Sequence, residues 1–184
     1  MTQTFLPQKG NFRKLIAFQK AECIYDITYY FAHKYLLKGD RTVDQMIQAA
    51  RSGRQTIAEG STAGTTSAET ELKLMNVARA SLQELLLDYE DYLRVRGLEK
   101  WDVKSQKSIQ CRRVCSAHNE SEYYRKAIEL RGDETICNIA ITLIHQTDVF
   151  LRKLIERLQD DFMKNGGVKE QMYRARINSR NHRV

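Results

Sequence analysis

Three side chains that can bind metals lie within one eight-residue stretch of the sequence. Cys111, Cys115 and His118 follow the spacing i, i+4, i+7, so on a helix they would face one way. Thiolate and imidazole groups bind zinc, but a structural zinc site needs four of them in tetrahedral geometry. The neighbouring sequence supplies no fourth ligand, so we predict neither a metal nor another cofactor. Cys23 and Cys137 lie in helical stretches and are interpreted as small core residues.

Arg113 and His118 have the spacing Arg-x4-His, which resembles the motif of the HEPN ribonucleases. In such an enzyme the histidine would act as general base, and the arginine would stabilise the phosphorane charge. The residue after the arginine is usually polar in that motif, whereas it is Val114 here. The chain has no His-Glu-x-x-His motif and no Walker phosphate loop. We therefore expect a protein that is not an enzyme. A HEPN-like ribonuclease is kept as a less favoured alternative.

Positive charge is concentrated in two segments. Residues 94–113 contain seven basic residues against two acidic ones, and residues 164–184 contain six against one, so each segment carries +5. Because the whole chain carries +7, the remainder is negative. Such asymmetry favours a polyanionic partner, and the alternative is a pair of solvated, solubilising segments. The candidate contacts to RNA or DNA are Lys104, Lys107, Arg112, Arg113, Lys169, Arg174, Arg176, Arg180 and Arg183.

Composition excludes several classes of protein. The 184 residues include one proline and nine glycines, too few for many short strands and turns, and 42% are hydrophobic, enough for a core. No apolar run approaches the roughly 20 residues of a membrane span, and the N-terminus lacks the apolar segment of a secretory signal. We therefore expect a cytoplasmic protein with reduced cysteines and no membrane partner.

Apolar periodicity predicts the elements that position these residues. Four helices are expected at about residues 12–37, 42–59, 67–96 and 133–164, and together they predict an all-α, up-and-down antiparallel four-helix bundle over residues 1–165. Residues 98–132 form a polar, basic insertion before the last helix, with a short helix from 119 to 130. Residues 166–184 form a basic suffix with one or two helical turns. The expected N-caps are Asn11, Asp40 or Thr42, Thr66 with Glu69 in a capping box, and Asp133.

The second predicted helix has small residues on its apolar seam. Its apolar positions step by 3, 4, 3 and 4 residues, as in a coiled coil. We expect Ala50 and Gly53 to let a neighbouring helix approach closely. The seam consists of Val43, Met46, Ala50, Gly53 and Ile57.

Two helical segments and the suffix resemble a known family. Residues 45–60 read QMIQAARSGRQTIAEG, residues 78–85 read ARASLQEL, and residues 161–176 read DFMKNGGVKEQMYRAR. These segments are similar to motifs of the 23S ribosomal RNA intervening-sequence protein family, in its longer branch. Thr56 stands where the family usually has asparagine, and residues 98–132 match poorly.

The resemblance implies a small bacterial four-helix-bundle protein that assembles into a homo-oligomeric ring, typically a pentamer. A related branch, the accessory variability proteins of diversity-generating retroelements, binds nucleic acid and a reverse transcriptase. The expected function is therefore a non-enzymatic accessory protein that binds RNA or DNA through its basic insertion and suffix. The alternative from a different class is a protein-interaction scaffold without nucleic-acid binding.

The charged residues of the two helical motifs have two readings. Arg51 and Arg54 are either phosphate contacts or members of ion pairs between helices or subunits. The ion-pair interpretation is favoured, and it includes a pair between Glu59 of the second predicted helix and Arg79 of the third. Exposed tyrosines beside basic residues are able to stack nucleobases. For Tyr29 and Tyr30 we favour the core or an oligomer interface, while both readings stay open for Tyr123 and Tyr124.

Overall fold

The computed structural model describes residues 11–181, with side chains to residue 178, and every regular element in this range is helical. The all-α prediction is therefore confirmed. Within the same range no helix is long and apolar enough to cross a membrane. A short 3-10 helix precedes the α-helices, and the elements are 3-10 helix Phe12–Lys14, α1 Ile16–Tyr35, α2 Arg41–Ala63, α3 Ala68–Val95, α4 Gln106–Ala117, α5 Ser121–Glu129, α6 Asp133–Asn165 and α7 Val168–Asn181.

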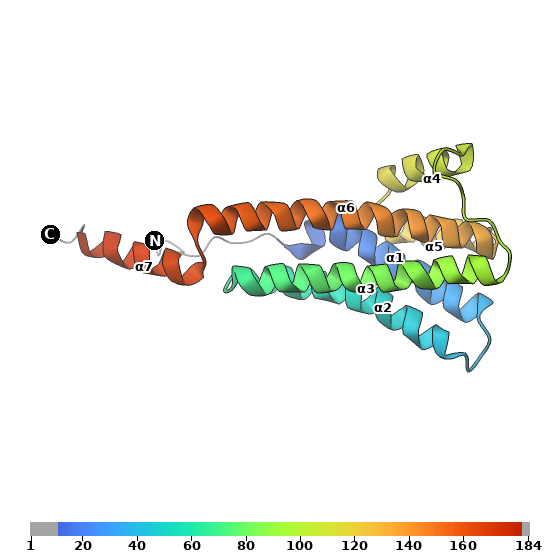
Figure 1. Cartoon of the computed structure of the whole chain (residues 1–184), viewed down its shortest axis with the longest axis horizontal. Helices are drawn as coiled ribbons and strands as arrows, with labels where there is room; N and C mark the ends of the chain where they lie inside the picture. The colour runs from blue at the N-terminus through green and yellow to red at the C-terminus, as the bar shows by residue number, and fades with distance from the viewer. Residues whose placement is uncertain (1–10, 182–184) are drawn as a thin grey trace.

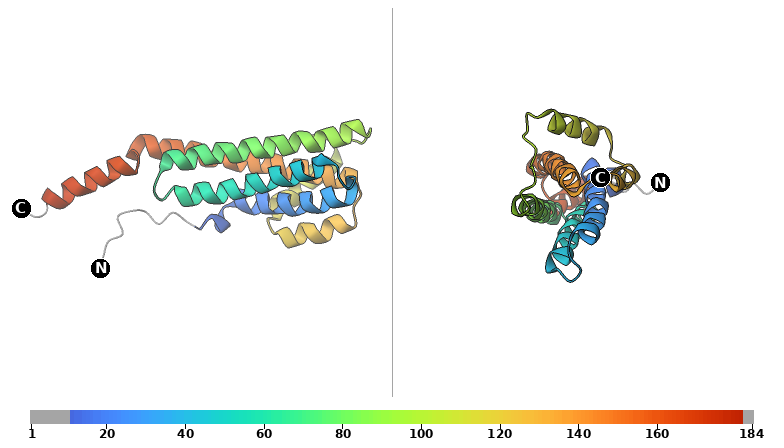
Figure 2. Two further views of the ribbon diagram at one scale, coloured as in Figure 1. Left: turned by 90° about the horizontal axis from the view of Figure 1, so that it is seen from below. Right: turned by 90° about the vertical axis from the view of Figure 1, so that its right-hand side faces the viewer.

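The four long helices lie side by side around a shared core. Helix α1 packs on α2 and α6, and α3 packs on the same two helices. In Figure 1, α1 and α3 run in one direction along the long axis, and α2 and α6 run in the other. The shorter helices lie outside this group: α4 packs against α6, and α5 against α1 (Figure 2). Helix α7 projects past the end of the bundle (Figures 1 and 2).

The small-residue seam of α2 is confirmed. Ala50 and Ile57 are fully buried. A Cβ atom added to Gly53 would lie 2.7 Å from the Cδ2 atom of Leu82 on α3, closer than real Cβ contacts come. The hydroxyl oxygens of Ser52 and Ser81 lie 2.9 Å apart beside this contact. Helices α2 and α3 therefore pack closely because position 53 has no side chain.

One predicted N-cap agrees with the structure, and a second caps a different element from the one expected. Asp40 precedes α2, and its Oδ1 atom accepts a hydrogen bond from the Thr42 backbone N–H at 2.8 Å. Asn11 caps only the short 3-10 helix, because Leu15 has an extended backbone and separates it from α1.

The other two predicted N-caps are wrong by one residue. Ser67, and not Thr66, begins α3, since its hydroxyl accepts the Thr70 N–H at 3.2 Å. Gly132 holds the extended cap position of α6, and Asp133 is the first helical residue. The Asp133 carboxylate instead accepts a hydrogen bond from the Tyr92 hydroxyl at 2.9 Å, which joins α3 to α6.

Two helices are longer than predicted, and one was not predicted. Helix α2 continues through Gly60 to Ala63, because Gly60 is a close packing position, with 3.1 Å from its added Cβ to Leu74, and not a terminator. The suffix forms the 14-residue helix α7 after Gly166, whose φ of 70° ends α6. The short helix expected in the insertion is present as α5, but α4 was missed.

Candidate nucleic-acid interface

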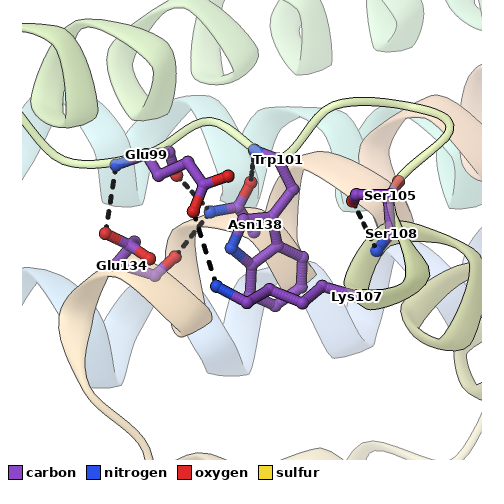
Figure 3. Close-up of polar contacts among 7 residues, drawn as sticks. All are labelled: Glu99, Trp101, Ser105, Lys107, Ser108, Glu134 and Asn138. Atoms are coloured by element: carbon purple, nitrogen blue, oxygen red, sulfur yellow. Dashed lines mark hydrogen bonds and ion pairs between the residues drawn. The ribbon is translucent and has the colours of Figure 1, made fainter.

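The basic insertion is fixed to α6 by one buried side chain. The Asn138 amide oxygen accepts a hydrogen bond from the Trp101 backbone N–H at 2.9 Å. Its amide nitrogen donates to the carbonyl oxygens of Glu99 and Glu134, both at 2.8 Å. Figure 3 shows Asn138 in contact with Glu99 and Trp101 of the loop between α3 and α4, and with Glu134 on its own helix. Because Asn138 satisfies backbone groups of the loop directly, α4 begins at a defined place on the bundle.

Carboxylates of the same region partly neutralise the insertion. The Glu134 carboxylate accepts the Glu99 backbone N–H at 3.0 Å. The Glu99 carboxylate in turn lies 3.4 Å from Lys107 Nζ, whose charge also lies 5.9 Å from the centre of the Trp101 ring (Figure 3). Lys107, a predicted phosphate contact, therefore has an acidic partner inside its own segment.

A buried lysine ties the far end of α4 to the bundle. Lys20 on α1 is 1% exposed, and its ammonium donates to the Cys115 carbonyl at 2.6 Å and to Gln146 Oε1 at 3.0 Å. The Gln146 amide nitrogen donates to the Arg112 carbonyl and to the Ser116 hydroxyl, each at 3.0 Å. Burial lowers the pKa of Lys20, opposed by nearby acidic groups. Helix α4 is therefore joined to both α1 and α6.

The remaining predicted residues of the insertion differ in accessibility. Lys104 and Arg113 are exposed. Arg112 is half-buried, and its guanidinium donates to the Ser108 hydroxyl at 2.7 Å. We call Lys104, Lys107, Arg112 and Arg113 the α4 surface.

The basic residues of the suffix lie on a projecting helix. Lys169, Arg174 and Arg176 are exposed on α7, and the polar contact of Arg174 is a 3.5 Å hydrogen bond to the Asn165 carbonyl. Tyr173 is 66% exposed. It follows Lys169 by four residues and precedes Arg176 by three, so the three share one helix face. We call Lys169, Tyr173, Arg174 and Arg176 the α7 surface. The side chain of Arg180 and the whole of Arg183 lie outside the described residues.

The α4 and α7 surfaces do not meet within one chain. They lie toward opposite ends of the long axis in Figure 1. Helix α6 contacts α4 at Gln146 and ends at Asn165 before α7, a span of roughly 30 Å at 1.5 Å per residue. One protomer therefore presents two separate basic surfaces.

The motif charges make different contacts from those expected. Arg79 pairs with Asp148 on α6, Nε to Oδ1 at 2.8 Å, and not with Glu59, which is exposed. The expected Glu59–Arg79 pair is wrong, because Arg79 faces α6. The Arg54 guanidinium lies 4.4 Å from the centre of the Tyr25 ring, a cation–π contact to α1.

The tyrosines separate into buried and accessible groups. Tyr124 is buried, and its hydroxyl donates to the His118 carbonyl at 2.9 Å, so it belongs to the core. Tyr123 stacks on the His118 ring, with centroids 3.8 Å apart and planes 4° apart. On α1, Tyr29 is 52% exposed and Tyr30 is half-buried.

The Cys111, Cys115 and His118 side chains do not converge as a metal site. The two sulfur atoms lie 3.9 Å apart, whereas the His118 ring stacks on Tyr123, with Nδ1 3.6 Å from the Glu120 carboxylate. In the part of the chain that the structure describes, no group of three or more His, Cys, Asp or Glu side chains is placed to hold a metal ion. No family model, curated protein or solved structure matches the chain.

Proposed function

We propose that the chain is a non-enzymatic accessory protein that binds the phosphate backbone of RNA or DNA as a homo-oligomer. The observation that carries this proposal is the α7 surface, a basic helix face that projects beyond the bundle. Among the described residues, Lys169, Arg174 and Arg176 have no carboxylate partner. Their charges are therefore available to replace the counterions of a nucleic acid. Tyr173, between two of them, offers a ring on which a base can stack.

The four long helices are proposed to be the up-and-down four-helix bundle of the 23S ribosomal RNA intervening-sequence family. Support comes from the two helical motifs that carry the resemblance, because they lie on α2 and α3 and contact each other. Gly53 of the first motif faces Leu82 of the second, and Ser52 faces Ser81. Residues that resemble one family in sequence thus form one contact in space.

Assembly into a ring, with a pentamer as the expected number, belongs to the same proposal. Exposed apolar side chains on the bundle support it, among them Val77 and Leu87 on α3, 42% and 61% exposed, and Tyr29 on α1. Several α7 surfaces would then act on one polyanion and raise its affinity through avidity. A protein partner such as a reverse transcriptase remains an expectation of the resemblance. Light scattering at micromolar concentrations tests assembly, and a mass of 21.5 kDa throughout would overturn the ring.

Fluorescence anisotropy with labelled single-stranded RNA and duplex DNA, over a range of salt concentrations, tests binding. The test variant changes Lys169, Arg174 and Arg176 to glutamine. The matched control changes Lys38, Arg41 and Lys73 to glutamine, an equal loss of exposed charge outside both basic segments.

We expect the test variant to reduce the slope of log K against log salt by about 0.7–0.9 per lost phosphate contact per protomer. The control variant should keep the wild-type slope. Equal slopes in the test variant and the wild type would exclude α7 as the binding surface. Failure of the wild type to bind either nucleic acid would favour the scaffold alternative. RNA cleavage without added metal that disappears in His118→Ala would favour the ribonuclease alternative.

A further inference from the structure

Two thiols of α4 lie one helical turn apart. The sulfur atoms of Cys111 and Cys115 are 3.9 Å apart. Residues four apart in an α-helix have Cα atoms about 6 Å apart, within the span that a disulfide bridges. Their Cβ atoms are about 5–6 Å apart and must approach to about 4 Å. Bond formation therefore requires side-chain rotation and distortion of this turn of α4, but no movement of another helix.

The two thiols differ in access. Cys115 is 1% exposed and lies beneath the backbone contact with Lys20. Both thiols line one pocket of about 380 Å³, together with Trp101, Tyr123 and Arg131. Cys111 is half-buried, so of the two thiols it is the more accessible to a small reagent.

The charges around the pair favour ionisation of the accessible thiol. The hydrogen bond from Cys115 lowers the pKa of Cys111 against the opposing effect of burial, and the positive charges of Arg112 and Arg131 lower it further. The same hydrogen bond, together with burial, raises the pKa of Cys115. Thr142 of α6 also faces the pair, with its hydroxyl 3.5 Å from the Cys111 sulfur. Nucleophilic attack by cysteine requires the thiolate, so Cys111 has the attacking position.

The other two cysteines have the opposite environment. Cys23 and Cys137 are fully buried. Burial raises the pKa of Cys23 to about 12 and also raises the pKa of Cys137. They therefore serve as unreactive thiols within the same molecule.

We propose that Cys111 is oxidised by small hydroperoxides and that Cys115 converts the product to an intrahelical disulfide. The Cys111 thiolate attacks the terminal peroxide oxygen, the O–O bond breaks, and the leaving oxygen takes a proton to become water or an alcohol. Cys111 is then a sulfenic acid. The Cys115 sulfur attacks the Cys111 sulfur and loses its proton, the S–O bond breaks, and the hydroxide leaves as water. The two thiols have given two electrons to one peroxide.

Peptide mapping of the full-length wild-type protein tests the proposal. The reduced protein is treated with hydrogen peroxide at pH 7, blocked with an alkylating reagent and analysed by mass spectrometry. We expect a Cys111–Cys115 disulfide to form faster than free glutathione is oxidised under the same conditions, while Cys23 and Cys137 stay alkylated. A rate at or below that of glutathione, or equal oxidation of Cys23, would overturn the proposal.

Two variants assign the roles of the two thiols. In Cys115→Ala, the sulfenic acid of Cys111 should persist and be trapped by a dimedone-type reagent. In Cys111→Ser, Cys115 should resist peroxide. Without peroxide, iodoacetamide at pH 7 should modify wild-type Cys111 about tenfold or more faster than Cys23. If Cys115 in Cys111→Ser formed a trappable sulfenic acid as fast as peroxide oxidises Cys111 in the wild type, the assignment would be wrong. The peptide mapping of the wild-type protein decides the proposal even if a variant misfolds.

Discussion

The two basic segments carry equal charge but are attached to the molecule in different ways. In residues 94–113, Arg94 pairs with Asp91 and Lys100 with Glu90, in addition to the Lys107–Glu99 pair. The loop and α4 are held by the buried residues Asn138 and Lys20. On α7, by contrast, none of the described cations has a carboxylate partner.

Two segments with the same net charge can therefore differ in how many of their cations are free of a carboxylate partner. A cation that already faces a carboxylate gains less from a phosphate, because binding must replace the existing pair. The α4 surface is therefore a positioned but partly neutralised surface, and the α7 surface is a free one. Of two segments with the same +5, we expect α7 to supply more of the binding free energy.

The largest effect on stability is expected from a change in the core of the four long helices, to which both basic segments are attached. Gly53→Leu should overpack the α2–α3 contact against Leu82 and lower the free energy of unfolding by about 3 kcal/mol or more. Gly132→Leu is the matched control, since nothing lies within 4 Å of an added Cβ there. Urea denaturation of both variants is the measurement. Similar stability in the two would mean that position 53 has room for a side chain.

A smaller effect is expected from releasing the insertion alone. Asn138→Ala leaves the Trp101 N–H and the Glu99 carbonyl without their partner, which should cost about 2–3 kcal/mol. Hydrogen exchange should also become faster in residues 99–117. Asn76→Ala is the control, because Asn76 is exposed and, among the described residues, its amide donates within α3, to the Leu72 carbonyl. If the two variants were equally stable, the anchoring of the insertion would lie elsewhere.

Sequence reasoning found the long helices because their apolar residues recur at the helical period. The seam through Ala50, Gly53 and Ile57 is one example. Helix α4 was missed because it lacks this signal: it buries only Ser108 and Cys115 and has no apolar stripe. The end of α2 was missed because glycine has two uses. Gly60 directly follows the predicted end of the second helix at residue 59, but in the structure it serves close packing inside α2.

The sequence predicted which segments are basic, but not which residues hold the insertion on α1 and α6. Charge counts located both basic segments. Lys20, however, contacts Cys115 and Gln146 across 95 and 126 residues, and Asn138 contacts Trp101 across 37. Contacts at such separations arise because the loop before α4 and α4 itself lie on α6, within reach of Lys20 on α1, and no local pattern signals them. For the same reason, the sequence did not reveal that Arg79 faces Asp148.

The attachment of α4 to α1 should depend on pH. In the folded protein burial lowers the pKa of Lys20, so the folded state binds fewer protons than the unfolded state between that pKa and the ordinary value of about 10.4. The contribution of Lys20 to stability should therefore rise with pH toward 10, and it appears as the stability of wild type minus that of Lys20→Met. Both proteins keep the buried thiols, whose raised pKa values lower stability over the same range. At pH 7 the variant should differ from wild type by about 1 kcal/mol, since lost hydrogen bonds oppose relieved desolvation. Urea denaturation from pH 7 to 9.5 gives the difference, and parallel curves for the two proteins would contradict a lowered pKa.

The smallest effect on stability is expected from the segment that we expect to matter most for binding. Removing residues 174–184 deletes more than half of α7, and the described polar contact of this part with α6 is the Arg174–Asn165 bond. The last buried residue of α6 is Leu158, so the core is unaffected, and unfolding free energy should change by less than about 0.5 kcal/mol.

Nucleic-acid binding by the truncated protein should nevertheless weaken, with a shallower salt slope and an unchanged number of subunits. An α7 helix that packs on a neighbouring subunit predicts the reverse, namely lost assembly with no specific change in slope. Calorimetry, light scattering and anisotropy on one truncated protein therefore distinguish a free basic helix from a structural one. If the truncated protein kept both its wild-type affinity and its wild-type slope, the difference in anchoring between α4 and α7 would have no consequence for binding.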